Sequence, residues 1–482
     1  MSAKRAILQN VDILPEIFAC LTTPLDKGSG MFVPSNSVHL QTLANAARCC
    51  KTFSSPALDA LWWKLDDIVP LFLLLPAIHR LGRSYVLNGI VEAHDWQRFD
   101  EYAKRTRHLV YIDDENFHPS VFFRIAQLRN NRPLLPSLVS LEMAPSFEAN
   151  ILSFISPSLR QCTICSQTSH DLYPVVWTGL DALASIAPNL NFLSVQTTLS
   201  KASLLSISRM SNLRTLLLYC KGINDFSIIR ALSSFQYLVH LEIFFDETTS
   251  LEARFDSSTG PILTMPFQSL ENIRTDIPPK HLNALLMCLQ PDKLKVLEVG
   301  ALSSSLEHGG DPVHWEKSFK TIRSRFSNSL QRLKLSYHTT PQDTADRTPS
   351  RLFKMFHPLL ELRALENATF LDFPWTEFSD EEFCELGAAW NGIKELHFVR
   401  SAMVRPPNAT FRTLHTFAKH CPNLRVLSIP LNTLPLPPLE EVDASSSSLQ
   451  ILRLGKVSNI ENMVAAGRYI KRVFPSLTEL FI

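Results

Sequence analysis

Cysteine and histidine side chains that could hold a metal ion or form a redox pair lie close together at one place in the sequence. Cys162-x-x-Cys165 has the spacing of zinc ligands, and His170 follows shortly after. A structural zinc site normally needs four ligands, usually from two such pairs, and no second pair follows. Cys162 also occupies a core position of the repeat described below, where a small apolar side chain packs well. We therefore interpret the pair as structural and expect neither a metal nor another cofactor.

Acidic clusters are the second group of residues that could do chemistry. Asp113-Asp114-Glu115 has no recognisable partner acid for hydrolysis, and Asp380-Glu381-Glu382 follows Ser379 in the order typical of a capping box at a helix start. Neither a Gly-x-Ser-x-Gly motif nor a Gly-Lys-Ser/Thr phosphate loop is present, and the 15 histidines are dispersed. These patterns predict no catalytic residue, and we expect that the chain is not an enzyme.

Composition narrows the class of protein further. The 482 residues include 47 Lys and Arg against 46 Asp and Glu, which argues against a general nucleic-acid or anionic-membrane surface. The longest apolar run, 68–78, contains Pro70 and Pro76 and is too short to span a bilayer. Nine scattered cysteines suit reduced thiols. The sequence predicts an intracellular protein of the cytoplasm, the nucleus or both.

Near the N-terminus, apolar residues recur at helical spacing. Asp12 can cap a first short helix and Pro15 lies in its first turn. A second helical period runs from Leu40 to Ala57; Ser55-Pro56 interrupts it, and Leu58 to Leu65 resumes it. One face of the first helix carries five apolar residues: Ile13, Leu14, Ile17, Phe18 and Leu21. Three such short helices cannot bury their apolar stripes against each other alone, so we expect them to pack on something else.

The pattern over residues 8 to 65 resembles the F-box, and the matching residues are Glu16-Ile17-Phe18-x-x-Leu21, Cys49-Cys50-Lys51-x-Phe53 and Leu61-Trp62. Two features depart from the family. Leu14-Pro15 looks like the usual Leu-Pro opener but would leave the helix too short, and the loop 24–37 is longer than the typical turn. The resemblance implies docking onto the Skp-family adaptor of a cullin–RING ubiquitin ligase. The predicted contact residues are Leu14, Ile17, Phe18, Leu21, Leu40, Leu43, Cys50, Phe53, Leu58 and Trp62. Some of these must instead hold the three helices together.

From residue 108 onward, the pattern Leu-x-x-Leu-x-apolar recurs at intervals of a few tens of residues, with helical stretches between many copies. Clear copies begin at Leu138, Leu190, Leu213, Leu238, Leu294, Leu330, Ile393, Leu424, Leu449 and Leu477, and weaker ones at Leu109, Leu159, Leu270 and Leu362. A short strand followed by a helix, repeated in this way, is typical of a leucine-rich-repeat solenoid. The predicted fold is α/β: a three-helix F-box-like domain followed by a curved solenoid with a parallel concave sheet and outer helices.

The predicted boundaries follow from these patterns. Residues 1–67 form the F-box-like domain, 68–107 a junction that caps the solenoid, and 108–482 the solenoid. Within 68–107 we expect a strand from Ser84 to Val91 and a helix from Asp95 to Arg107. Long polar loops, such as 246–266, 301–313 and 338–350, are either plain connections or recognition loops.

Strand alternation decides which repeat residues face outward. The fourth and sixth positions of each copy point into the core, so the third and fifth face the concave side, as for Phe192 and Ser194. These positions mix apolar and charged residues, which suits a protein ligand, although other parts of the chain could instead cover them. The predicted substrate-binding residues are Phe192, Leu217, His240, Glu242, Arg274, Val296, Glu298, Arg332, Lys334, Val426, Ile451 and Arg453.

Over nearly its whole length the chain resembles F-box/leucine-rich-repeat proteins of the fungal type. The resemblance implies a non-catalytic substrate receptor that binds a Skp-family adaptor, through it a cullin, and an unknown protein destined for ubiquitin-dependent degradation. The alternative is a ligase-independent repeat scaffold whose F-box-like part is degenerate, for which the long loop 24–37 is the best support. Adaptor binding distinguishes the two.

Overall fold

The computed structural model describes most of the chain and divides it into two compact units, residues 1–223 and 224–482. The described ranges are 13–22, 35–112, 117–118, 120–144, 152–165, 173–197, 199–220, 227–232, 234–245, 267–277, 279–300, 312–336, 349–373, 378–399, 407–432, 436–438, 447–455 and 463–481. Asp12, the acidic cluster 113–115 and most of the long polar loops lie outside these ranges.

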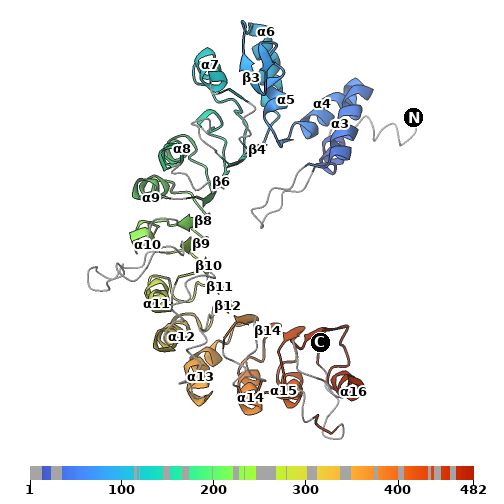
Figure 1. Cartoon of the computed structure of the whole chain (residues 1–482), viewed down its shortest axis with the longest axis vertical. Coiled ribbons are helices and arrows are strands. Elements are labelled where there is room, and N and C mark those ends of the chain that lie inside the picture. Colours follow the sequence, from blue (N-terminus) through green and yellow to red (C-terminus); the bar gives the residue numbers. More distant parts are fainter. Residues whose placement is uncertain are drawn as a thin grey trace. The chain divides into compact units, whose positions relative to one another are not determined.

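The first unit begins with three helices and continues as a parallel sheet (Figure 1). Its strands pair in the order β1-β4-β5-β6-β7-β8, and β2 and β3 form a separate antiparallel hairpin. The helices are α2 (Ile13–Ala19), α3 (Ser37–Cys49), α4 (Lys51–Leu61), α5 (Val69–Phe72), α6 (Ala93–Ala103), α7 (Ser120–Leu128), α8 (Tyr173–Ile186) and α9 (Lys201–Ser208). The strands are β1 (Lys64–Leu65), β2 (Ile78–Leu81), β3 (Ser84–Leu87), β4 (His108–Ile112), β5 (Ser140–Ala144), β6 (Gln161–Cys165), β7 (Phe192–Gln196) and β8 (Thr215–Cys220).

The second unit consists of alternating strands and helices, with the strands β9 to β17 paired in chain order. Its helices are α10 (Ser227–Leu232), α11 (Pro279–Met287), α12 (Pro312–Phe326), α13 (Pro349–Phe356), the 3-10 helix η4 (His357–Glu361), α14 (Asp380–Ala389), α15 (Arg412–His420) and α16 (Met463–Val473). Its strands are β9 (His240–Phe245), β10 (Asn272–Thr275), β11 (Val296–Val299), β12 (Arg332–Ser336), β13 (Asn367–Leu371), β14 (Glu395–Val399), β15 (Val426–Ser428), β16 (Ile451–Arg453) and β17 (Glu479–Phe481).

The repeat leucines form continuous rows because neighbouring strands pair in parallel and in register. Leu297 on β11 pairs with Leu333 on β12, and Leu396 pairs with Leu427 on the strands further along. All four are fully buried, and the connecting helices cover the face that they occupy (Figure 1). Together the two units contain 15 such parallel strands. The predicted α/β leucine-rich-repeat architecture, with a long parallel sheet and outer helices, is confirmed.

For two of the weaker repeat copies, the predicted register is wrong. Leu109 pairs with Leu141 and therefore occupies the fourth position, so that copy begins at Thr106, which hides the pattern. The copy assigned to Leu362 begins at Leu365, and its fourth position is Ala368, paired with Leu333. In both copies a small residue replaces a leucine of the motif. The predicted start lies three residues from the true one, after it at Leu109 and before it at Leu362.

The N-terminal helices also differ from their predicted boundaries. The break between the second and third helices is at Cys50, whose backbone is extended, and Pro56 lies inside α4. Ser84 begins β3 as expected, but this strand ends at Leu87, and the predicted helix 95–107 is α6, which ends at Ala103. The boundaries at 67 and 107 stay predictions. Among the described helices, none has the length and apolar content needed to cross a lipid bilayer.

Candidate interaction surfaces

The helical module, residues 13–22 and 35–61, has a very small core. Its buried cluster consists of Leu14, Phe18, Leu43 and Ala57, and partly buried apolar side chains surround it. The Phe18 ring meets Phe53 of α4 edge-on, with ring centroids 5.7 Å apart. These contacts join α2 to α4, and α3 packs along α4 through Leu43. A core of this size leaves much of the module's apolar surface without a partner inside the module.

Helix α2 carries a second apolar stripe that faces solvent. Successive residues of an α-helix are about 100° apart, so Ile13, Ile17 and Cys20 lie together, next to the stripe of Leu14 and Phe18. Leu14 is 1% exposed, whereas Ile13 is 38% and Ile17 is 43% exposed. Cys20 is also exposed. We call Ile13, Ile17 and Cys20 the exposed stripe.

The structure separates the predicted adaptor-contact residues by burial. Leu14, Phe18 and Leu43 are buried inside the module, so they hold its helices together. Ile17 and Cys50 are exposed and accessible to a partner. The remaining residues are half-buried: Leu21, Leu40, Phe53, Leu58 and Trp62. Of these, Leu21 and Phe53 pack against the core, whereas the Trp62 ring lies 4.7 Å from that of Tyr102, centroid to centroid. Spacing alone could not make this separation. Contact with an adaptor stays a prediction for all of them.

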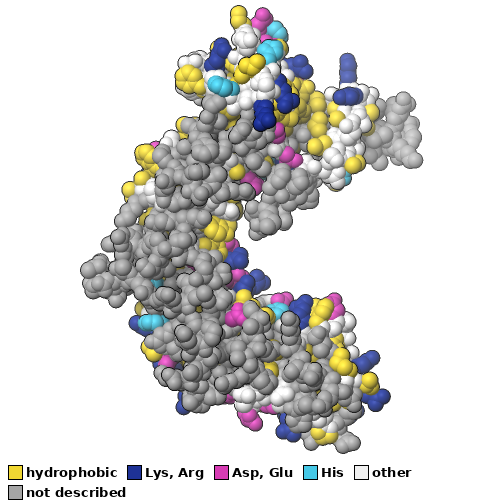
Figure 2. All heavy atoms as spheres, viewed as in Figure 1, with side chains coloured by type: hydrophobic (Ala, Val, Ile, Leu, Met, Phe, Trp, Pro, Cys, Tyr) yellow, Lys and Arg dark blue, Asp and Glu magenta, His cyan; other side chains and the backbone are white. Residues whose placement is uncertain are grey.

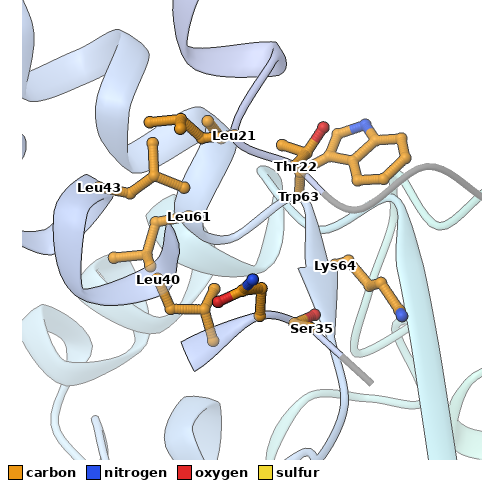
Figure 3. Close-up of a pocket in the computed structure, with 10 residues that line it drawn as sticks. Leu21, Thr22, Ser35, Leu40, Leu43, Leu61, Trp63 and Lys64 are labelled. Atoms are coloured by element: carbon orange, nitrogen blue, oxygen red, sulfur yellow. The ribbon is translucent and has the colours of Figure 1, made fainter. Parts of the chain in front are cut away.

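A hollow lies where the module meets β1 (Figure 3). Leu40, Leu43 and Leu61 gather on one side of it, while Ser35 and Lys64 lie on the other. The remaining lining residues are Leu21, Thr22, Asn36, Ala60 and Trp63. The hollow is therefore apolar towards the helices and polar towards the strand.

Hydrogen bonds and ion pairs attach the module to the first strands. The carbonyl of Trp63 accepts the backbone N–H groups of Arg107 and His108. The carboxylate of Asp66 accepts the N–H of Ser35 at 2.7 Å and lies 3.2 Å from the Lys64 ammonium. On the other side of the module, Arg105 donates to Asp59 of α4.

His108 lies in this junction, with its ring centroid 4.1 Å from that of Trp63. Burial, together with the nearby positive charges of Lys64 and Arg107, lowers the pKa of His108 from 6.5 to about 4. The imidazole is therefore neutral at pH 7. Sequence reasoning did not single out His108, because the residues that bury it come from a distant part of the chain.

The sheet face opposite the connecting helices, here called the helix-free face, carries two rows of side chains. In the second unit the first row contains the third repeat positions: His240, Asn272, Val296, Arg332, Asn367, Glu395, Val426, Ile451 and Glu479. The second row contains the fifth positions: Glu242, Arg274, Glu298, Lys334, Thr369, His397, Ser428, Arg453 and Phe481. All of these side chains are half-buried or exposed.

Every predicted substrate-binding residue occupies one of these two positions, including Phe192 and Leu217 in the first unit. Ser194, also predicted to face outward, is 2% exposed because Gln196 extends over it and donates to its hydroxyl at 3.4 Å. The register therefore follows the prediction, while accessibility at Ser194 does not. Binding of a substrate by these residues stays a prediction.

Charges on the second row alternate along four neighbouring strands: Glu242, Arg274, Glu298 and Lys334. The Arg274 guanidinium lies 3.9 Å from the Glu242 carboxylate and 3.5 Å from that of Glu298. His240 lies 3.0 Å from the same Glu242 oxygen. In the view of Figure 2, basic and acidic side chains are interspersed over the second unit. The charges on β9, β10 and β11 therefore largely neutralise one another.

The neighbouring strand β12 carries two outward cations, Arg332 and Lys334. Among the residues that the structure describes, neither Arg332 nor Lys334 forms an ion pair. Further along, burial lowers the pKa of His397, and Arg453 lowers it too, against the opposing effect of Glu395. Arg453 itself lies over the Phe481 ring at 5.3 Å.

The cysteine pair on β6 does not form a metal site. Cys162 and Cys165 are three residues apart on one strand, so their side chains leave opposite faces of the sheet. Cys162 is fully buried in the core, as predicted. Burial raises the pKa of Cys162 to about 12 and that of Cys165 to about 11, so both thiols stay protonated. The capping box predicted at Ser379 and Glu382 is confirmed.

Comparison with known proteins finds similarity in structure only. No protein-family model and no curated protein sequence matches the chain. A chain in the crystal structure of the Rad7 and Elc1 complex from yeast is 13% identical, with 97% of this chain and 92% of that chain covered, at a TM-score of 0.40.

Two bacterial proteins are also similar. The leucine-rich-repeat protein LegL7 of Legionella pneumophila is 12% identical, over 77% of this chain and 89% of that one, at a TM-score of 0.33. Internalin C2 of Listeria monocytogenes is 15% identical, over 44% and 87%, at a TM-score of 0.24. The fold assignment depends on the strand pairing described above and not on these similarities.

Proposed function

We propose that the chain is the non-catalytic substrate-recognition subunit of a Skp–cullin–F-box type ubiquitin ligase. The observation that carries the proposal is the exposed stripe of α2, beside a module core of only four buried residues. Apolar side chains presented together on a rigid helix favour burial against a partner. The F-box resemblance of the same residues gives that partner its identity, a Skp-family adaptor.

In this role the chain performs no bond chemistry. It would hold a captured protein close to a ubiquitin-charged enzyme carried elsewhere in the complex. Tethering raises the effective concentration of the two reactants, which is sufficient to accelerate transfer. The raised pKa values of Cys162 and Cys165 keep both thiols protonated, which agrees with a role without nucleophilic cysteines on β6.

The captured protein would bind the helix-free face. Its two rows mix apolar side chains such as Val426 and Ile451 with charged ones such as Arg332 and Glu298. Apolar anchors surrounded by polar groups are typical of protein–protein contacts. In-register pairing holds these side chains in a fixed arrangement, which reduces the entropy lost on binding.

The test is Ile17→Asp in the full chain, co-expressed with a Skp-family adaptor. Ile17 is 43% exposed, so a carboxylate there stays hydrated in the free protein but would be buried in the complex. We expect co-purification with the adaptor to fall at least 100-fold, with the circular dichroism spectrum and melting temperature unchanged.

The matched control is Ala19→Asp, which adds the same charge to the same helix. Ala19 is exposed and lies on the opposite side of α2 from Ile17, about 200° away. This variant should bind the adaptor like the wild type. Equal binding by the Ile17→Asp variant and the wild type would contradict the assignment of the docking surface.

The second candidate function is a repeat scaffold that works without a ligase. It is favoured by the distance along the chain between α2, which ends at Ala19, and α3, which begins at Ser37. This connection is longer than the short turn typical of the F-box. The scaffold predicts that the wild-type chain does not bind the adaptor at any concentration tested, so the same pull-down decides between the two functions.

A further inference from the structure

We propose that Arg332, Lys334, Asn367 and Thr369 form a binding site for an acidic, unphosphorylated peptide segment. These four residues are called the basic block. The proposal depends on the proposed function only in assigning that segment to a captured protein. Binding of the segment itself is a property of the second unit alone.

Register brings the basic block together. On β12, Arg332 and Lys334 are two residues apart and project from the same face, about 6.6 Å from each other. Arg332 pairs with Asn367 and Lys334 with Thr369 on β13, so the two strands place these side chains about 4.8 Å apart. The four side chains thus occupy the corners of a compact rectangle on the helix-free face.

The chemistry of the basic block suits carboxylates. A guanidinium offers five N–H donors, an ammonium three, an amide two and a hydroxyl one. Carboxylates accept bonds from all of these groups, and the charged donors form the stronger ones. Two cations side by side can bind two neighbouring acids of one segment.

Within the described residues, the absence of ion pairs at these two cations distinguishes β12 from β10. Arg274, two strands away, already faces Glu242 and Glu298. Lys334 is the register neighbour of Glu298, but that carboxylate also faces Arg274, so it only partly neutralises Lys334. On the other side, the nearest acid in the rows is Glu395, which pairs with Asn367 and lies beyond it from Arg332. Among the described strands β9 to β17, only β12 therefore carries a Lys or Arg in both rows.

An apolar side chain beside the basic block favours a peptide over a free anion. Val296 pairs with Arg332 on the neighbouring strand and is half-buried, so it offers an apolar contact beside the cations. A segment with two acidic residues flanked by an aliphatic one would contact both kinds of surface.

The test measures binding of a fluorescein-labelled twelve-residue peptide, with two neighbouring glutamates flanked by leucines, to the full chain by fluorescence anisotropy. The variant is Arg332→Glu with Lys334→Glu. The matched control is Lys317→Glu with Lys354→Glu, which changes the net charge equally at exposed helix positions of the same unit.

We expect the variant in the basic block to bind the peptide at least tenfold more weakly than the wild type, and the control to bind within twofold. Binding should also weaken with salt, because the Debye length falls from about 10 Å at 0.1 M to about 3 Å at 1 M. A peptide with lysines in place of the glutamates should not bind.

Three outcomes would overturn the proposal: equal loss in both variants, equal binding of the lysine peptide, or binding only when a phosphoserine replaces the glutamates. Circular dichroism shows whether the variant is folded, and Arg332→Gln with Lys334→Gln provides a milder change if it is not. Adaptor pull-down of the same variants should be unaffected. A failure here with intact adaptor binding therefore leaves the proposed function standing.

Discussion

The helical module and the repeat strands of the second unit are both built on leucines, yet they are completed differently. In the repeats, Leu333 is covered on both sides by paired strands, and it is fully buried without help from another molecule. In the module, Leu14 and Phe18 are buried, but Ile13 and Ile17 of the same helix are not. The repeat leucines are thus buried by their own neighbours, whereas the module leaves apolar side chains of α2 exposed.

The largest expected effect comes from placing an aspartate in the core of the repeats or in the core of the module. Leu333→Asp should prevent the second unit from folding, because an unpaired buried carboxylate costs several kcal/mol. Phe18→Asp should unfold only the module, since that core does not contain repeat residues. Hydrogen exchange with mass spectrometry would show loss of protection in residues 13–61 alone. Loss of protection in β9–β17 of the Phe18→Asp protein would break the comparison.

A smaller effect compares two leucines at the same repeat position. Leu333→Ala should cost about 2–5 kcal/mol, as for other fully buried leucines. Leu480 on β17 is 39% exposed, so Leu480→Ala should cost at most about 1.5 kcal/mol. Urea unfolding of both variants measures the difference. Equal costs would mean that coverage by a following strand does not determine how much a repeat leucine contributes.

The smallest expected effect concerns pH at the junction of module and repeats. His108 is 8% exposed, and its pKa in the folded state is about 4, below the ordinary 6.5. A lowered histidine pKa stabilises the fold fully above pH 6.5, and this contribution is lost as the pH falls from 6.5 towards 4. Urea midpoints at pH 7.0, 5.5 and 4.5 should therefore fall more steeply for the wild type than for His108→Asn. Parallel pH profiles would show that His108 is not buried by Trp63.

The fold could be predicted largely from sequence because its signal is repetitive. Each leucine copy supports the others, so even a weaker copy such as the one at Leu270 is predicted in the right register. The predicted register is wrong at Thr106 and Ala368, where small residues stand at leucine positions and are nevertheless buried. A small residue does not contribute to the leucine pattern in the sequence, even where the larger side chains around it bury it.

The candidate surfaces could be predicted only in part. Alternation on a strand is strict, so the outward positions followed directly wherever the predicted register is right; on β13 the predicted start at Leu362 misses Asn367 and Thr369. On α2 the spacing of three and four groups Ile17 with Phe18, and only contact with Phe53 of α4 shows which of them is buried. Arg274 pairs with two glutamates, whereas Arg332 forms no ion pair with any described residue. This difference also depends on strands that are distant in sequence.

In-register pairing also determines which residues of a peptide ligand the helix-free face could contact. Neighbouring strands are about 4.8 Å apart. A peptide in the polyproline II conformation advances about 3.1 Å per residue and presents every third residue on the same side, so one of its turns spans about two strand spacings. Arg274, Lys334 and His397 occupy every second strand of the second row. A peptide crossing the strands would present every third residue to these side chains, and ligands selected from a random library should share a motif with a period of three.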